Sequence, residues 1–162
     1  MKRLKHELPP IFSRQSRVLI LGSFPSVKSR EISFYYGHKM NRFWKVLSIL
    51  LNEKLPENNS ERKALVLNHR IALWDVVQSC EINGSSDSSI RNVKANEISR
   101  ITSFANITLI VCNGSKAYNL FNKFINDAGP KVIKLPSTSP ANAAWSLDKL
   151  VEAYRVILEY VD

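Results

Sequence analysis

Four short apolar runs constrain the fold of this chain more than any other feature of its sequence. They are rich in β-branched residues and span Arg17–Leu21, Ile71–Trp74, Ile107–Cys112 and Val132–Leu135. Apolar runs of this length predict strands buried on both faces, as in parallel sheets. Because helical segments separate them, we expect an α/β fold: a three-layer α/β/α arrangement with a central four-stranded parallel sheet.

Helical periodicity accounts for most of the remaining chain. Apolar residues recur every three or four positions after Asn41, after Ser115 and after Ser146, and shorter helices are expected over 61–69 and about 95–104. The carboxyl ends of parallel strands meet at one edge, where such sheets bind ligands. The loops at that edge are therefore expected to form the site, and they cover 22–41, 75–92, 113–115 and 136–144.

The chain is strongly basic. Of its 162 residues, 23 are Lys or Arg and 14 are Asp or Glu, for a net charge of +9. The length predicts one domain, assigned to residues 17–162, after a basic N-terminal arm over residues 1–16 in which Pro9-Pro10 blocks a helix. The positive charge favours a nucleic-acid partner, although a basic protein without a polyanionic partner has the same composition.

Cysteine spacing and hydropathy disfavour several classes of protein. Cys80 and Cys112 form no metal or redox motif and are expected to be buried free thiols, so no metal or other cofactor is expected. The N-terminal residues lack the apolar core of a signal peptide, and no apolar run reaches the roughly 20 residues of a membrane span. We therefore expect a cytoplasmic protein that does not associate with membranes.

The loop after the first apolar run carries residues suited to ligand contact. It begins Gly22-Ser23-Phe24-Pro25-Ser26, in which the glycine permits a sharp turn and close approach to a ligand. Farther along, Phe34, Tyr35 and Tyr36 are adjacent aromatic residues on the same loop. Such a cluster suits stacking on a nucleobase, and some of its members could equally pack into the core.

Polar residues follow the other three runs. Asp75 ends a buried strand in a basic protein, so it either accepts a specific donor or caps the following turn, and Asn113 admits the same two interpretations. The run Pro136–Asn142 places small hydroxyl residues between two prolines. This composition suits close contact with a phosphodiester, and it also fits an ordinary Ser/Pro loop.

Together these segments resemble the uracil-DNA glycosylase superfamily. The GSFPS turn followed by NRFW is similar to its first motif, and LPSTSPAN after a later strand is similar to its second. The runs YYGHKMNRFW and IALWDVVQSCEINGSSDSSIRN resemble the hypoxanthine-DNA glycosylase branch, family six. Phe24 replaces the Asp or Asn that positions water in most members, and Leu135 replaces the His of uracil-specific members, so classical uracil activity is not expected.

The resemblance implies a monofunctional DNA-deoxyinosine glycosylase that acts without metal, as a monomer, on single- or double-stranded DNA. It would flip the nucleotide and release hypoxanthine, leaving an abasic site. Asn41 would orient the attacking water, and Asp75 would accept the N1–H that adenine lacks. The expected base-binding residues are Gly22, Ser23, Phe24, Tyr35, Tyr36, Asp75 and Asn113, and the expected DNA-binding residues are Ser26, Lys39, Arg42, Ser137, Thr138, Ser139 and Asn142.

Three alternatives remain compatible with the sequence. The first is a glycosylase of the same fold that removes uracil or xanthine. The second is a non-catalytic nucleic-acid-binding module, which would bind DNA without producing abasic sites. The third is a hydrolase that uses Ser23 or Ser26 as a nucleophile, although the chain has no G-x-S-x-G sequence.

Overall fold

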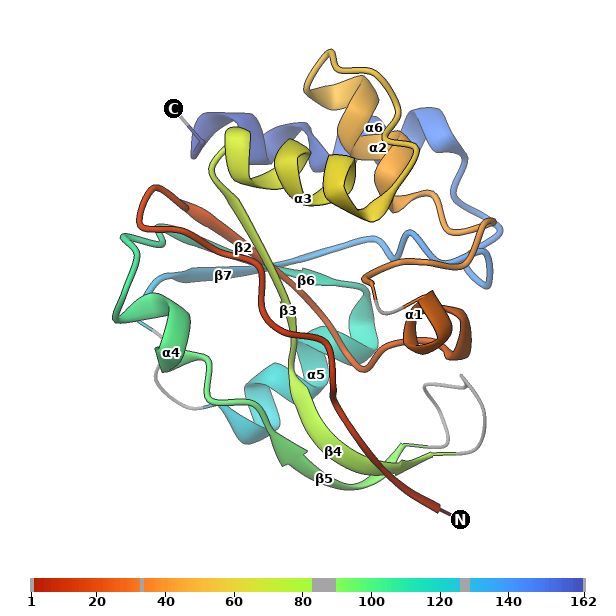
Figure 1. Ribbon diagram of the computed structural model, residues 1–162, viewed down its shortest axis with the longest axis vertical. Helices are drawn as coiled ribbons and strands as arrows, with labels where there is room; N and C mark the ends of the chain where they lie inside the picture. The colour runs from red at the N-terminus through yellow and green to blue at the C-terminus, as the bar shows by residue number, and fades with distance from the viewer. Residues whose placement is uncertain (1, 33, 83–89, 126–128, 162) are drawn as a thin grey trace.

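The computed structural model describes residues 2–32, 34–82, 90–125 and 129–161. Its central feature is a four-stranded parallel sheet in the order β3-β2-β6-β7 (Figure 1). The strands are β2 (Val18–Gly22), β3 (Ile71–Asp75), β6 (Leu109–Asn113) and β7 (Lys131–Leu135). Each coincides with one of the apolar runs, and β2 and β3 are buried along their whole length, which confirms the predicted sheet.

Helices cover both faces of this sheet, as the three-layer prediction requires. Figure 1 shows α2, α3 and α6 on one side of the sheet and α4 and α5 on the other. Their bounds are Phe43–Leu50 (α2), Asn59–Asn68 (α3), Ser99–Thr102 (α4), Ser115–Phe124 (α5) and Leu147–Tyr154 (α6), the last continuing as a 3-10 turn over Arg155–Glu159. The loop expected over 22–41 contains a further short helix, α1 (Val27–Ile32).

A second, three-stranded sheet was not predicted. It has the order β1-β4-β5 and is antiparallel, with β1 at Lys2–Lys5, β4 at Val77–Ile82 and β5 at Arg91–Ala95. The sequence analysis assigned 75–92 to a loop, of which residues 83–89 lie outside the described residues. The β5 side chains are mostly exposed, so this edge strand is held by backbone hydrogen bonds and leaves no apolar pattern in the sequence.

The N-terminal segment, which the sequence analysis assigned to a basic arm, packs onto the domain. Lys2–Lys5 pair with β4, and Ile11 exchanges backbone hydrogen bonds with Leu73 of β3. The buried Tyr35 hydroxyl donates to the carbonyl oxygen of Pro9 at 2.9 Å. These contacts hold the N-terminal segment against β4 and β3.

The core contains both cysteines as free, buried thiols, as predicted. Burial raises the pKa of the Cys112 thiol to about 12. No helix among the described residues is long and apolar enough to cross a membrane.

Candidate active site

A cavity of about 110 Å³ lies at the carboxyl edge of the parallel sheet. Its wall is formed by the loops after β2 and β7 and by Asp75 and Asn113, the last residues of β3 and β6, as the topology predicts. Its lining residues are Gly22, Ser23, Phe24, Pro25, Ser26, Ser29, Tyr35, Tyr36, Asn41, Asp75, Asn113, Ser137, Thr138 and Ser139. The structure thus brings together Asn41, every expected base-binding residue, and four of the expected DNA-binding residues.

Thr138 connects the two asparagines of the cavity. Its hydroxyl donates to Asn41 Oδ1 at 2.8 Å and accepts from Asn113 Nδ2 at 3.1 Å, while its backbone N–H donates to Asn113 Oδ1 at 3.0 Å. Thr138 is 1% exposed and its hydroxyl is used within the protein, and its expected contact with DNA stays a prediction. Asn41 Oδ1 also accepts the backbone N–H of Phe43, the first residue of α2, which has no acceptor within the helix.

This arrangement determines what Asn41 offers to a ligand. A carboxamide oxygen has two lone pairs, and the two donors described above occupy both of them. The Phe43 N–H can only donate, which identifies the bound amide atom as the oxygen. The NH₂ group of Asn41 is therefore the part of this amide that can contact a molecule in the cavity.

Substituting Thr138 by valine is expected to lower the free energy of unfolding by about 1–3 kcal/mol, because two asparagine side chains lose a buried partner while the volume is retained. Urea denaturation of both proteins measures the difference. Thr138→Ser keeps the hydroxyl and should lose less. A valine variant as stable as the wild-type protein would show that the hydroxyl network contributes little to stability.

Arg42 stabilises the loop over 136–144 through hydrogen bonds to its backbone. Its guanidinium donates to the carbonyl oxygens of Ser139 (3.0 Å), Asn142 (3.1 Å) and Trp145. These hydrogen bonds use the two terminal nitrogens of the guanidinium, and the expected contact of Arg42 with DNA stays a prediction. Asn142, whose amide donates to the carbonyl oxygen of Ser137, lies outside the cavity, as does the exposed Lys39.

Two polar groups meet the backbone of Gly22 at the inner end of the cavity. A Cβ built on Gly22 would lie 2.4 Å from Asp75 Oδ1 and 3.3 Å from the Tyr36 hydroxyl oxygen, so only glycine leaves room for both. The Tyr36 hydroxyl is buried and has no hydrogen-bond partner among the described residues. Burial, reinforced by the charge of Asp75, raises the pKa of Tyr36 well above its usual value, so this hydroxyl remains a donor.

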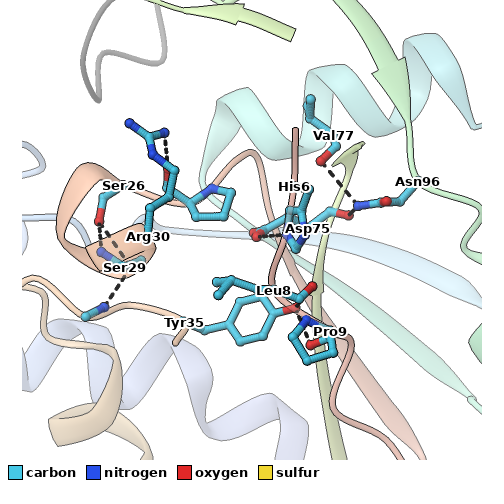
Figure 2. A network of polar contacts seen from close by, with 12 residues as sticks. His6, Leu8, Pro9, Ser26, Ser29, Arg30, Tyr35, Asp75, Val77 and Asn96 are labelled. Carbon is cyan, nitrogen blue, oxygen red and sulfur yellow. Dashed lines mark hydrogen bonds and ion pairs between the residues drawn. The ribbon is translucent and has the colours of Figure 1, made fainter. Parts of the chain in front are cut away.

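His6 is a cavity-adjacent residue that sequence reasoning missed. Its Nε2 lies 2.7 Å from Asp75 Oδ2, and the two side chains are 2% and 5% exposed (Figure 2). Asn96 also holds Asp75 in place, because its side-chain amide donates to the backbone carbonyl oxygen of Asp75 at 2.9 Å. One signal was present in the sequence: Leu4, His6 and Leu8 alternate with charged residues, as in a half-buried strand.

The aromatic residues of the first loop divide into separate roles. Tyr35 is 3% exposed, and its hydroxyl holds the N-terminal segment through the carbonyl oxygen of Pro9. Its side chain therefore forms a buried part of the cavity wall. Tyr36 stacks on Phe43 with ring centroids 4.0 Å apart, so one of its faces is already covered. Phe24 lines the cavity with its ring against the edge of His6, at a centroid distance of 6.1 Å.

A wider groove of about 490 Å³ adjoins the cavity. It is lined by the start of α5 and by the loop over 136–144, including Lys116, Lys134, Ser137, Ser139 and Asn142. Two lysines, small hydroxyl residues and a helix N-terminus form a surface that favours phosphate groups.

Comparisons with known proteins agree with this geometry. The model of the uracil DNA glycosylase superfamily matches residues 9–161. A curated hypoxanthine DNA glycosylase of Methanosarcina acetivorans is 32% identical over 148 residues, covering 90% of this chain and 93% of the relative. A second, from Methanosarcina barkeri, is 31% identical over 140 residues, covering 85% and 88%.

A solved structure supports the same fold. The solution NMR structure of a candidate uracil DNA glycosylase from Methanosarcina acetivorans superposes with a TM-score of 0.79 and 28% sequence identity. The superposition covers 95% of this chain and 98% of the other.

Proposed function

Because this chain belongs to the uracil DNA glycosylase superfamily, we propose that it is a DNA glycosylase that hydrolyses deoxyinosine and releases hypoxanthine. The observation that carries the proposal is the cavity itself. At the carboxyl edge of the sheet, the cavity is lined by the amide of Asn41, which a buried hydrogen-bond network holds, and by the carboxylate of Asp75. The two curated relatives named hypoxanthine DNA glycosylase support the choice of base.

The reaction breaks the bond between C1′ of the sugar and N9 of the base. The electron pair leaves with the base and the sugar gains positive charge. A water molecule then adds to C1′, and the proton that it loses neutralises the departing base. Asn41 is the residue proposed to hold that water, through its NH₂ group, because both lone pairs of its oxygen are occupied. A neutral amide orients water without titrating, and orientation alone supplies several kcal/mol of the barrier reduction, on the order of 7 or more in well-aligned systems.

Base selection is assigned to the inner end of the cavity. Hypoxanthine carries a proton on N1, whereas adenine presents a lone pair there. Asp75 lines the cavity beside Gly22 and is the residue proposed to accept that N1–H. A buried acceptor left without a donor is unfavourable, which discriminates against adenine.

The groove beside the cavity is the proposed path of the DNA strand. Ser137 and Ser139 line both spaces, so they are placed to contact the phosphates next to the flipped nucleotide, and Lys116 and Lys134 supply charge. The exposed Lys39, adjacent to the cavity loop, is proposed to contact the same strand. One domain offers the whole site, so we propose a monomer that acts on single- and double-stranded DNA.

The function is tested by incubating the protein, with chelator present, with oligonucleotides that carry one deoxyinosine, deoxyuridine or deoxyxanthosine. Alkali then cleaves abasic sites. Cleavage at deoxyinosine, undiminished by chelator, is the expected result. Cleavage confined to deoxyuridine or deoxyxanthosine would assign a different base, and DNA binding without cleavage at any of the three would indicate a non-catalytic module.

A further inference from the structure

The Tyr36 hydroxyl is a buried polar group without a function in the proposed hydrolysis. Tyr36 lines the cavity, and no described residue accepts the proton of its hydroxyl. Tyr36 has a φ of 54°, a strained value for a residue with a side chain, and Phe43 holds its ring by stacking. The loop therefore keeps a hydroxyl donor beside Gly22 in the cavity wall, at a cost in backbone strain.

An acceptor lies next to this donor. Asp75 Oδ1 and the Tyr36 hydroxyl oxygen both approach Gly22, at 2.4 Å and 3.3 Å from the position that its Cβ would take. One carboxylate acceptor and one hydroxyl donor thus occupy the same small area of the cavity wall. A ligand that satisfies both must carry a donor and an acceptor on adjacent atoms.

Hypoxanthine has such an edge, because its N1–H donor is bonded to the carbon that bears the O6 acceptor. Adenine has the reverse arrangement, with an acceptor at N1 and an amino group at C6. Deamination converts the second edge into the first. The Asp75–Tyr36 pair is therefore complementary to the lactam edge that deamination creates.

His6 determines which oxygen of Asp75 is used. Its Nε2 occupies Oδ2 at 2.7 Å, and Oδ1 is the oxygen beside Gly22. Figure 2 shows the imidazole beside Asp75, with Tyr35 holding Pro9 farther along the same N-terminal segment. A buried carboxylate is costly without a hydrogen-bonded partner, and His6 supplies that partner from a segment remote in sequence.

We propose that Asp75 and Tyr36 together read the lactam edge of the flipped base, and that His6 is the positioning residue that aims Asp75 at it. The inference rests on the proposed function and deepens it. It makes the N-terminal segment part of base selection, through a residue that itself does not touch the substrate.

The test measures binding, so that it does not depend on turnover. Short single strands carry one uncleavable nucleotide, in which an arabino 2′-fluorine disfavours the cationic sugar. The base is hypoxanthine, adenine or unsubstituted purine, which has hydrogen at C6 and a lone pair at N1. Dissociation constants are measured for the wild-type protein and for the variants Tyr36→Phe, His6→Ala and His6→Gln.

The wild-type protein is expected to bind the hypoxanthine strand at least about tenfold more tightly than the purine strand, because two hydrogen bonds are at stake. Tyr36→Phe and His6→Ala should each reduce that preference by about tenfold while changing purine binding little. His6→Gln retains an N–H donor toward Asp75 and should recover part of the preference. A residue that only supported the fold would weaken binding of all three strands alike.

Two results would overturn the inference. One is equal affinity of the wild-type protein for the hypoxanthine and purine strands. The other is an unchanged preference in both Tyr36→Phe and His6→Ala. Either result can occur together with normal cleavage of deoxyinosine, so the failure of this inference is distinguishable from failure of the proposed function.

Discussion

Replacing Asn41 by alanine is expected to slow deoxyinosine hydrolysis at saturating oligonucleotide by about 10²- to 10³-fold, the usual effect of removing one preorganised donor. The side chain is held at both lone pairs of its oxygen, so its NH₂ group is fixed relative to the cavity. Single-turnover cleavage of a deoxyinosine strand measures the rate. The affinity for an uncleavable strand should change much less, because the attacking water does not take part in the contacts that hold the base before the reaction.

The alanine variant also removes the acceptor for the Phe43 N–H and should lose about 1 kcal/mol of stability. Asn58→Ala is the matched control. Asn58 caps α3 by accepting the backbone N–H of Glu61 at 2.8 Å and does not line the cavity. It should lose similar stability and keep full activity. An Asn41→Ala protein that cleaves deoxyinosine at the normal rate would exclude Asn41 from water positioning.

Gly22→Ala is expected to reduce kcat/KM for deoxyinosine by about 10²-fold, because a displacement of reacting groups by about 1 Å costs that much. The new Cβ would lie 2.4 Å from Asp75 Oδ1, on a short side chain that His6 already holds. The carboxylate must therefore move away from the base. Steady-state kinetics with deoxyinosine strands measures the loss.

Gly129→Ala is a control that strains the backbone without displacing a neighbouring side chain that the structure describes. No atom of the described residues lies within 4 Å of a Cβ on Gly129, but its φ of 80° is unfavourable for alanine and should cost about 1 kcal/mol of stability. That variant should retain its activity. Full activity of Gly22→Ala, with an unchanged preference for hypoxanthine over purine, would show that this part of the wall does not contact the base.

The loops that form the cavity were predictable from the sequence because strand ends and loop composition are local properties. The apolar runs located all four parallel strands, and topology alone then places Gly22, Asp75 and Asn113 at one edge. The resemblance to a known family singled out Asn41. Its placement in the cavity matches that expectation, and its role stays a prediction.

Other parts of the site left little trace in the sequence. His6 lies 69 residues from Asp75, and β1 and β5 are polar edge strands held by backbone hydrogen bonds. Arg42 and Thr138 are residue types that often contact DNA. In this structure their side chains donate hydrogen bonds to groups within the protein. A residue type states which bonds a side chain can form, and the surrounding chain decides which bonds it does form.

The sequence by itself determined the four parallel strands, the main helices and the edge at which the loops meet, because burial and hydrophobic periodicity act over short stretches of chain. Only the tertiary structure decided which polar groups are free to contact a ligand. Hydrogen bonds between distant segments occupy the oxygen of Asn41 and one oxygen of Asp75, and leave the Tyr36 hydroxyl without a partner among the described residues. Those long-range bonds, which no local pattern encodes, turn a set of plausible residues into a specific site.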